Sequence, residues 1–408
     1  MNLRLGSARH REAWQLLRQS GPRGLAQRIV RVAYHRLSAS DLEAPLDFDH
    51  IADSRGLRLA EPERRPARGT PLTVGWICTP PRPGSGGHTT LFRMVEGLEA
   101  AGHRCVLYIH DVFHGELARH EQVIRDGWPG MRAEVRSVSD GLGPLDAYVA
   151  SGWESAHVLA SYPESPARRL YFVQDYEPWF YPAGSHQVLA EDSYRFGFRP
   201  ITVGPMLADV LRDQFGLEAA VAEFGCDTAV YQLTNPEPRR GIVFYTKRDY
   251  ARRGFALGII ALREFHRRHP DHEIHLFGDA TVRAPFPAVN HGTLRPAQLS
   301  ELYNECAAGL AMSFTNLSLV PDEMVACGVV PVVGESNHAK ASIDNPHVRW
   351  VRPTPGAMAD ALSEAVEGEG PAPAVVASSI RSTPWGTAQR TTLETIEDEV
   401  YGRSTRNW

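Results

Sequence analysis

The chain is poor in lysine, in paired cysteines and in long apolar runs. Only Lys247 and Lys340 are lysines among its 43 basic residues, so arginine is expected wherever a cationic side chain is needed. Its five cysteines are widely spaced and form no Cys-x-x-Cys pair, which argues against a disulfide framework or a zinc site and favours a reducing cytosol. No run of 18 apolar residues occurs, and the N-terminus lacks the apolar stretch of a secretory leader, so neither a membrane span nor export is expected.

The composition that is present indicates a folded protein of two domains. The chain has 408 residues, of which 43% are hydrophobic and 22% charged, and this length exceeds what one hydrophobic core usually serves. Its formal net charge of -5 provides no general attraction to a polyanion. Nucleic acid is therefore not expected as a partner.

The N-terminal region differs in composition from the rest. Residues 1–36 hold eight arginines against one glutamate, interleaved with apolar residues at roughly helical spacing. Two interpretations remain open: a solvated helix that packs on the body of the protein, and a helix that lies on a membrane surface. Residues 37–70 are irregular and rich in proline and arginine, which is typical of an arm or linker. We therefore predict an extension at 1–69.

An α/β domain is predicted at 70–228. A buried-strand pattern at 72–77 is followed by a Gly/Pro loop at 80–87, an amphipathic helix at 91–101 and a second strand at 106–109. This order is that of a βα unit in a parallel sheet. Further apolar runs alternate with helical stretches at 146–150, 170–173, 200–203 and 219–224.

A second α/β domain is predicted at 229–383, after a proline-rich link at 235–240. Its expected elements are a strand at 242–245, a helix at 255–268, a strand at 274–277, a helix at 296–307, an apolar run at 309–312, a helix at 321–327 and a strand at 329–333. Residues 384–401 indicate one more helix, and the segment 384–408 could pack back on the first domain. Two such domains leave a cleft between the carboxyl ends of their strands, where ligands of open sheets bind.

A glycine-rich loop lies between the first strand and its helix. Gly84–His88 would expose backbone N–H groups and a helix N-terminus, which suit a phosphate or a sugar hydroxyl. Thr89 stands where a dinucleotide fingerprint requires glycine, which argues against a dehydrogenase. The alternative is a tight turn without a ligand.

A basic segment follows the first strand of the second domain. Residues 245–254 contain four cations, Lys247, Arg248, Arg252 and Arg253. Guanidinium groups form paired bonds to phosphate oxygens and neutralise the charge that grows on a departing diphosphate. The alternative is a solvated basic loop.

A third motif places a carboxylate at a helix start. In the segment 313–328, Glu323 begins a helix that ends at Gly328. On its own this glutamate could merely complement the helix dipole.

Together these motifs resemble the retaining glycosyltransferases of the GT-B fold, of the family-4 type, over about 72–335. The family's Gly-Gly loop matches Gly86-Gly87, and its hinge motif matches 225–227. The family's Gly-Arg followed by Lys-Gly falls on Arg248 and on Arg253-Gly254, with arginine in place of the family lysine. The resemblance implies two Rossmann-like domains that face each other across a cleft.

The family's two-glutamate motif aligns its second glutamate with Glu323 and its first with Thr315, so the first carboxylate is absent from this chain. That carboxylate usually lies beside the donor sugar. The resemblance implies donor-binding roles for Gly86, Gly87, Lys247, Thr315, Asn316, Leu317, Ser318 and Glu323, with Glu323 on the ribose.

The run Tyr171–Glu177 resembles the subgroup of rhamnosyltransferases that build bacterial surface polysaccharides from dTDP-rhamnose. This resemblance makes Asp175 the residue that orients the acceptor hydroxyl or accepts its proton. A turn or cap residue is the alternative for Asp175. Because a glutamate built for a sugar hydroxyl would be unpaired beside a methyl group, the missing carboxylate also suits a deoxy sugar.

The resemblance therefore predicts a metal-independent, retaining transfer of a hexosyl unit, in which Arg248 and Arg253 hold the diphosphate. The acceptor would be a glycan or a glycolipid, and the enzyme would act in the cytoplasm, at the inner face of the membrane if 1–36 binds lipid. Asp47-Phe48-Asp49 has metal-binding spacing but lies in the irregular arm, and His88 could touch substrate. Alternatives are a GT-B epimerase or phosphorylase, a non-catalytic nucleotide-sugar-binding protein and a membrane-anchoring adaptor.

Overall fold

The computed structural model of the chain describes residues 46–82, 84–223, 225–317, 319–336, 339–367, 370–381 and 384–402. The predicted basic helix at 1–36, Ser318 and most of the polar tail lie outside the described residues. The chain divides into two compact units, one ending at Ile51 and the other beginning at Ala52. In the first unit, the described part forms a short 3₁₀ turn, η2 (Phe48–His50), with the Asp47 carboxylate 3.7 Å from Nδ1 of His50.

The second unit contains two parallel sheets. The first sheet has the strand order β3-β2-β1-β4-β5-β6-β7, and every pair in it is parallel. Its strands are β1 (Thr73–Cys78), β2 (Arg104–Ile109), β3 (Glu134–Ser137), β4 (Ala147–Ala150), β5 (Arg168–Val173), β6 (Arg199–Val203) and β7 (Ala220–Ala222). This topology confirms the predicted α/β domain with a parallel sheet.

The helices that accompany the first sheet connect consecutive strands. They are α2 (Gly86–Ala100), α3 (Leu117–Gly127), α4 (Trp153–Ala160), α5 (Ser185–Ser193) and α6 (Pro205–Phe215), with the 3₁₀ turns η3 (Val138–Asp140) and η4 (Glu177–Phe180). Strands β1, β2 and β5 are buried along nearly their whole length, because helices cover both faces of a parallel sheet. Trp76 and Phe172 meet edge to face in this core, with their ring centroids 6.2 Å apart.

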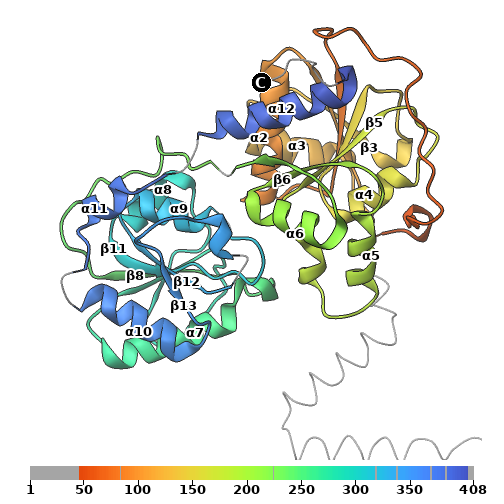
Figure 1. The fold of residues 1–408 in the computed structure, drawn as a ribbon. Coiled ribbons are helices and arrows are strands. Elements are labelled where there is room, and N and C mark those ends of the chain that lie inside the picture. The colour runs from red at the N-terminus through yellow and green to blue at the C-terminus, as the bar shows by residue number, and fades with distance from the viewer. Residues whose placement is uncertain are drawn as a thin grey trace, which may run out of the picture. The chain divides into compact units, whose positions relative to one another are not determined.

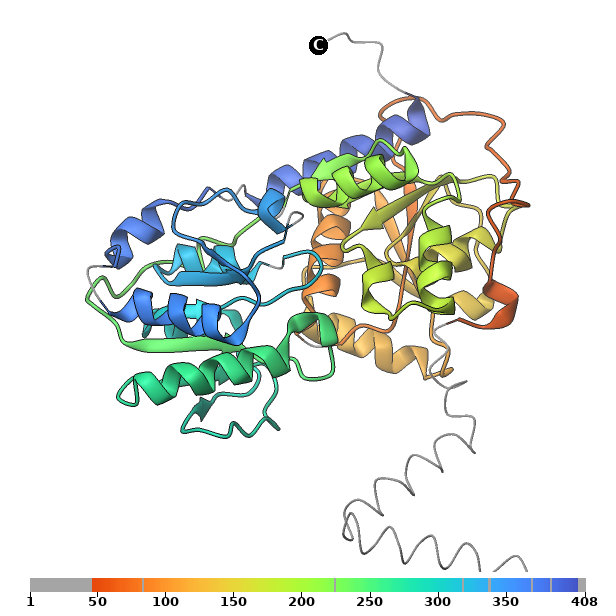
Figure 2. The ribbon, with the colours of Figure 1, turned by 60° about the horizontal axis from the view of Figure 1, so that its bottom comes forward.

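The second sheet has the order β10-β9-β8-β11-β12-β13 and is also parallel throughout. Its strands are β8 (Gly241–Tyr245), β9 (Ile274–Phe277), β10 (Val289–Asn290), β11 (Cys306–Leu310), β12 (Val330–Gly334) and β13 (Arg349–Val351). Its helical elements are η5 (Ala251–Arg253), α7 (Phe255–Arg268), α8 (Pro296–Tyr303), α9 (Val320–Ala326), η6 (Ala339–Ser342), α10 (Pro355–Val366) and α11 (Pro373–Ser378). Helices α7 and α10 lie side by side on one face of this sheet (Figures 1 and 2).

One predicted boundary in this domain is wrong. The helix expected at 296–307 ends at Tyr303, and Cys306 already begins strand β11. The apolar residues after Tyr303 belong to the buried strand, since Cys306 and Ala308 are fully buried in the cores on the two faces of the sheet. Periodicity alone did not separate the end of the helix from the start of a short buried strand.

The last helix, α12 (Trp385–Tyr401), returns to the first sheet and lies along α2 (Figure 1). Its buried face, which includes Ala388, Ile396 and Val400, belongs to the core of the first domain. The chain therefore crosses between the sheets twice. The crossings meet where Gly225 faces Trp385, because a Cβ on Gly225 would lie 2.8 Å from the Trp385 backbone nitrogen. Within the described residues, no helix has the length and apolarity needed to span a bilayer.

Candidate active site

The candidate site lies where loops from the carboxyl ends of the two sheets meet. In parallel sheets these ends share one edge, so loops that are distant in sequence are brought together. The loop after β5 carries Asp175, while the segments after β8 and β11 carry Arg252 and Thr315. Hydrogen bonds and an ion pair join these three residues across the domain boundary.

Asp175 is the centre of this junction, and only 8% of its surface is exposed. Its Oδ1 accepts hydrogen bonds from the backbone N–H groups of Tyr176 and Asn316, each at 2.9 Å. Its Oδ2 accepts from Oγ1 of Thr315 at 2.8 Å and from Nη1 of Arg252 at 3.3 Å. Burial raises the pKa of the Asp175 carboxyl, and the charge of Arg252 and the hydrogen bonds from the 315–316 segment oppose that rise. We call Asp175, Arg252, Thr315 and Asn316 the Asp175 cluster.

The Asn316 side chain adds two more bonds between the domains. Its Nδ2 donates to the carbonyl oxygens of Gln174 and Val203, at 3.1 Å and 3.3 Å. The Asn316 carbonyl in turn accepts from Oγ of Ser313, which closes the loop on itself. Thr315 and Asn316, predicted to bind the donor, therefore use the Thr315 hydroxyl and the Asn316 amides for contacts within the protein. Leu317 is buried in the core of the second domain.

Arg252 and Arg253 occupy the short turn η5, which ends at Gly254. The guanidinium of Arg252 lies 4.3 Å from the centroid of the Phe180 ring, in addition to its ion pair with Asp175. Gly254 has a φ of 61°, and a Cβ there would approach both Met312 and Phe314 to 3.1 Å. Glycine is thus required at this position to turn the chain directly into α7.

Arg253 is half-buried, and its guanidinium has no hydrogen bond or ion pair to any described residue. Burial and the neighbouring charge of Arg252 lower the pKa of Arg253 to about 10, while Asp175 and Tyr245 oppose the shift. The group still carries its proton at neutral pH. A protonated guanidinium without a partner, beside the carboxyl end of β8, is suited to bind an anion such as a diphosphate.

The other two cations of the basic segment face a different neighbour. Nη2 of Arg248 donates to Oγ1 of Thr281 at 2.6 Å and lies 3.5 Å from Oδ2 of Asp279, at the end of β9. Its side chain is about half exposed. Lys247 lies 5.7 Å from the centroid of the Tyr245 ring. Arg248, predicted to act with Arg253, is thus held by Asp279 and Thr281, and it forms no hydrogen bond or ion pair with the Asp175 cluster in the described part of the chain.

Glu323 lies in the first turn of α9, as predicted, and shares a hydrogen bond with the Tyr231 hydroxyl. Burial raises the pKa of Glu323 to about 7, and the nearby charge of Asp322 adds to the rise. Arg93 on α2 opposes it and also lies 3.6 Å from Oδ2 of Asp227. Glu323 is therefore near residues of both domains.

Gly86 and Gly87 are exposed and form the first turn of α2. The helix therefore begins at Gly86, earlier than the predicted start at residue 91. Ser85 caps this helix, and its Oγ lies 2.9 Å from Nδ1 of His88. Nε2 of His88 lies 3.0 Å from the Thr79 carbonyl oxygen. Both ring nitrogens of His88 are thus occupied, which favours a role in holding the helix start over direct contact with substrate.

Two carboxylates at the same edge of the first sheet were not predicted from the sequence. Oε2 of Glu177 accepts a hydrogen bond from the Trp153 backbone N–H at 2.5 Å. A Cβ on Gly152 would lie 3.2 Å from both Oε1 of Glu177 and Oε2 of Glu154. Burial raises the pKa of Glu154 to about 7. Burial and the neighbouring charge of Glu154 raise the pKa of Glu177 well above its usual range. Glu177 lay inside the run Tyr171–Glu177, but its closeness to Glu154 is visible only in the fold.

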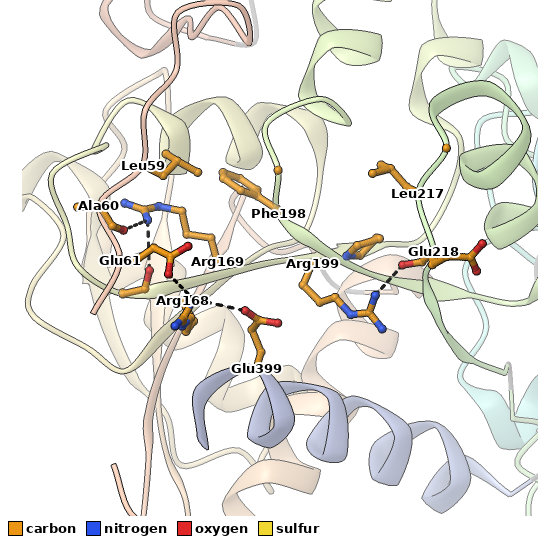
Figure 3. Close-up of a pocket in the computed structure, with 14 residues that line it drawn as sticks. Leu59, Ala60, Glu61, Arg168, Arg169, Phe198, Arg199, Leu217, Glu218 and Glu399 are labelled. Carbon is orange, nitrogen blue, oxygen red and sulfur yellow. Dashed lines mark hydrogen bonds and ion pairs between the residues drawn. The ribbon is translucent and has the colours of Figure 1, made fainter. Parts of the chain in front are cut away.

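A separate hollow of about 470 Å³ lies at the opposite, amino ends of β5 and β6 (Figure 3). Its arginines are bound within the protein: Arg168 to Glu61, and Arg199 to the Glu218 carbonyl. Arg169 donates to five carbonyl oxygens of the surrounding loops. Arg168 and Arg169 thereby hold Ala60 and Glu61 of the arm against the sheet. Among the described residues, no three His, Cys, Asp or Glu side chains gather in a way that could hold a metal ion.

Parts of this chain are similar to known proteins. Residues 240–363, most of the second domain, match the family described as WsaF, C-terminal domain. The O-antigen biosynthesis protein RfbC of Myxococcus xanthus is 32% identical over 302 residues, which are 68% of this chain and 23% of that protein. The chain thus spans about a quarter of the length of this curated relative.

Solved structures confirm the predicted GT-B fold. The crystal structure of Anabaena HepE in complex with UDP and glucose has a TM-score of 0.62, at 14% identity, over 80% of this chain and 100% of that chain. The catalytic domain of Arabidopsis thaliana starch synthase IV, bound to ADP and acarbose, has a TM-score of 0.54 at 12% identity, over 81% and 100% of the two chains. A putative UDP-N-acetylglucosamine 2-epimerase of Listeria monocytogenes shares the fold, with a TM-score of 0.53 at 10% identity, over 81% and 96%. At these identities the likeness establishes the fold alone.

Proposed function

We propose that this chain is a glycosyltransferase of polysaccharide biosynthesis that takes its sugar from a nucleotide diphosphate donor. The observation that carries the proposal is the guanidinium of Arg253 at the carboxyl end of β8, which pairs with no residue that the structure describes. A binding site for a leaving diphosphate requires a preorganised positive charge of this kind. The match to the WsaF C-terminal domain covers the segment that contains this arginine, and the relative in O-antigen biosynthesis points to a surface glycan as the product.

The proposed chemistry divides the work between the two domains. Arg253, with Arg248 at the rim, neutralises the diphosphate as the bond to the anomeric carbon breaks. The N-terminal turn of α2, at Gly86 and Gly87, offers backbone N–H groups to a phosphate or a sugar hydroxyl. Glu323 accepts hydrogen bonds from the ribose.

The transfer is proposed to retain the anomeric configuration. A departing phosphate oxygen then takes the proton of the acceptor hydroxyl on the same face of the sugar, and no metal ion is needed. The first domain binds the acceptor, a glycan or a glycolipid, in the cytoplasm.

The finer proposal is that the donor is dTDP-rhamnose. Two features of the sequence support it: the resemblance of Tyr171–Glu177 to rhamnosyltransferases, and Thr315 at the position of the family's first glutamate. Thr315 has no carboxylate of its own, and the neighbouring Asp175 carboxylate is already hydrogen-bonded within the protein. A site without a free carboxylate discriminates less against a deoxy sugar, because it leaves no buried group unpaired beside the methyl.

Calorimetric titration of the full chain with dTDP, UDP and GDP tests this function. We expect binding of at least one nucleoside diphosphate, with preference for dTDP, and transfer from the matching nucleotide sugar when acceptor is supplied. Failure to bind any nucleoside diphosphate would contradict the proposal. Conversion of the nucleotide sugar without acceptor would instead indicate an epimerase, and binding without turnover a non-catalytic protein.

A further inference from the structure

Asp175 has no free hydrogen-bonding capacity in this structure. An ionised carboxylate has about four lone-pair sites, two on each oxygen. In Asp175 four donors occupy them: the backbone N–H groups of Tyr176 and Asn316, the Thr315 hydroxyl and the Arg252 guanidinium. A general base needs a free lone pair directed at the proton it removes. This geometry is poorly suited to the proton-accepting role that the sequence suggested for Asp175.

The partners of Asp175 lie beside the diphosphate site. Arg252 directly precedes Arg253 in the turn η5. The carbonyl oxygen of Arg252 accepts a hydrogen bond from the Phe314 N–H at 2.9 Å, which ties η5 to the loop that holds Thr315. A single carboxylate from the first domain therefore fixes both segments of the second domain that flank Arg253.

The charges distinguish the two neighbouring arginines. Two adjacent guanidinium groups repel each other, and the charge of Arg252 is one cause of the lowered pKa of Arg253. Asp175 neutralises the charge of Arg252 through the ion pair. Its own charge raises the pKa of Arg253, against the effect of Arg252. With Asp175 ionised, the charge of Arg252 is neutralised within the protein, and that of Arg253 is left for a ligand.

We propose that Asp175 is a positioning residue for the donor diphosphate: by binding Arg252, Thr315 and Asn316 across the domain junction, it holds Arg253 in place without forming an ion pair with it. This inference rests on the proposed function. It makes donor binding depend on a side chain of the domain that receives the acceptor. The first domain thereby contributes to the donor site in the absence of acceptor.

The test is calorimetric binding of a nucleoside diphosphate, dTDP or whichever of the panel binds, to the full chain without acceptor. Asp175→Asn keeps the size of the side chain but removes its charge, and we expect the dissociation constant to rise by about 10-fold or more. Asp209→Asn, on the surface of α6, is the matched control and should bind as the wild type does. If Asp175→Asn binds the nucleotide normally and loses only kcat, the positioning role is wrong and a general base is favoured.

Two further variants separate positioning from a loss of folding. Thr315→Val removes one donor to Asp175 at nearly constant volume, and we expect weaker nucleotide binding in the same direction, by about 2- to 5-fold. Arg252→Gln should weaken binding too, and combining it with Asp175→Asn should cost less than the product of the two single effects, because both act through one contact. Additive effects of the two would overturn the proposal. Circular dichroism confirms that each variant is folded.

The failure of this inference can be told apart from failure of the proposed function. If the wild type binds no nucleoside diphosphate, both are overturned. If the wild type binds, and Arg253→Ala weakens binding while Asp175→Asn does not, the diphosphate site stands and only the role of Asp175 is wrong.

Discussion

Arg252 and Arg253 are neighbours in the chain, yet the structure gives their charges different surroundings. Arg252 is enclosed by Asp175 and by the face of Phe180, whereas Arg253 has no hydrogen-bond partner or counter-ion within the described part of the chain. Arg248, which matches the family motif as well as Arg253 does, is already paired with Asp279. The three guanidinium groups are therefore not interchangeable, although the sequence presents them as one basic segment.

Arg253→Ala is accordingly expected to reduce turnover more than Arg248→Ala. Loss of a preorganised charge at a developing anion costs about 2.7–4 kcal/mol, so we expect kcat to fall on the order of 10²- to 10³-fold for Arg253→Ala. The loss for Arg248→Ala should be smaller, because Arg248 would first have to leave Asp279. Steady-state kinetics with a nucleotide sugar measures kcat of both variants. Arg263→Ala, at an exposed position on α7, is the control. An equal or larger loss for Arg248→Ala would contradict this ranking.

Gly254 connects a turn to a helix and thereby sets where Arg253 lies. The sequence identified this glycine through the family motif, and the structure supplies the physical reason, a positive φ together with close contacts to Met312 and Phe314. We expect Gly254→Ala to destabilise the fold by about 1–3 kcal/mol, from the left-handed conformation and from crowding. The free energy of unfolding in urea measures this change.

Gly356→Ala is the matched control for the glycine prediction. Gly356 lies in the first turn of α10, where an added Cβ would meet nothing within 4 Å. We expect the free energy of unfolding to be unchanged or to rise by up to about 0.5 kcal/mol, since alanine favours a helix. If both substitutions had the same effect, the strain argument for Gly254 would be wrong.

The elements of the fold could be predicted from the sequence more fully than the site. Strands β1, β8 and β9 and helix α7 follow directly from apolar periodicity and from their bounding glycines. The contacts of Asp175 could not be predicted from the sequence, because Thr315 and Asn316 lie 140 and 141 residues further along the chain and no local pattern links them to Asp175. The run Tyr171–Glu177 identified Asp175 as a candidate. The role of Asp175, however, depends on which loops of the second domain contact it in the fold.

At the scale of the whole molecule, several acids are protonated more readily in the folded protein than in the unfolded chain. Burial raises the pKa of Glu154 and of Glu323 to about 7, and that of Asp322 to about 6. Between about pH 4.5 and pH 7 the folded protein therefore holds protons that the unfolded chain has released. The stability that these groups contribute is present below that range and is lost as the pH rises through it.

Glu154→Gln should remove part of this pH dependence. Glutamine cannot ionise beside Glu177, so the variant is expected to lose less stability than the wild type between pH 5 and pH 8. One pKa unit corresponds to about 1.4 kcal/mol, and partial access to solvent reduces the effect, so we expect the two pH profiles to differ by about 1–2 kcal/mol. Urea unfolding at both pH values measures this difference, with the exposed Glu164, replaced by glutamine, as the control variant. A Glu154→Gln variant that lost as much stability as the wild type would show that the Glu154 carboxyl is not held away from water at the sheet edge.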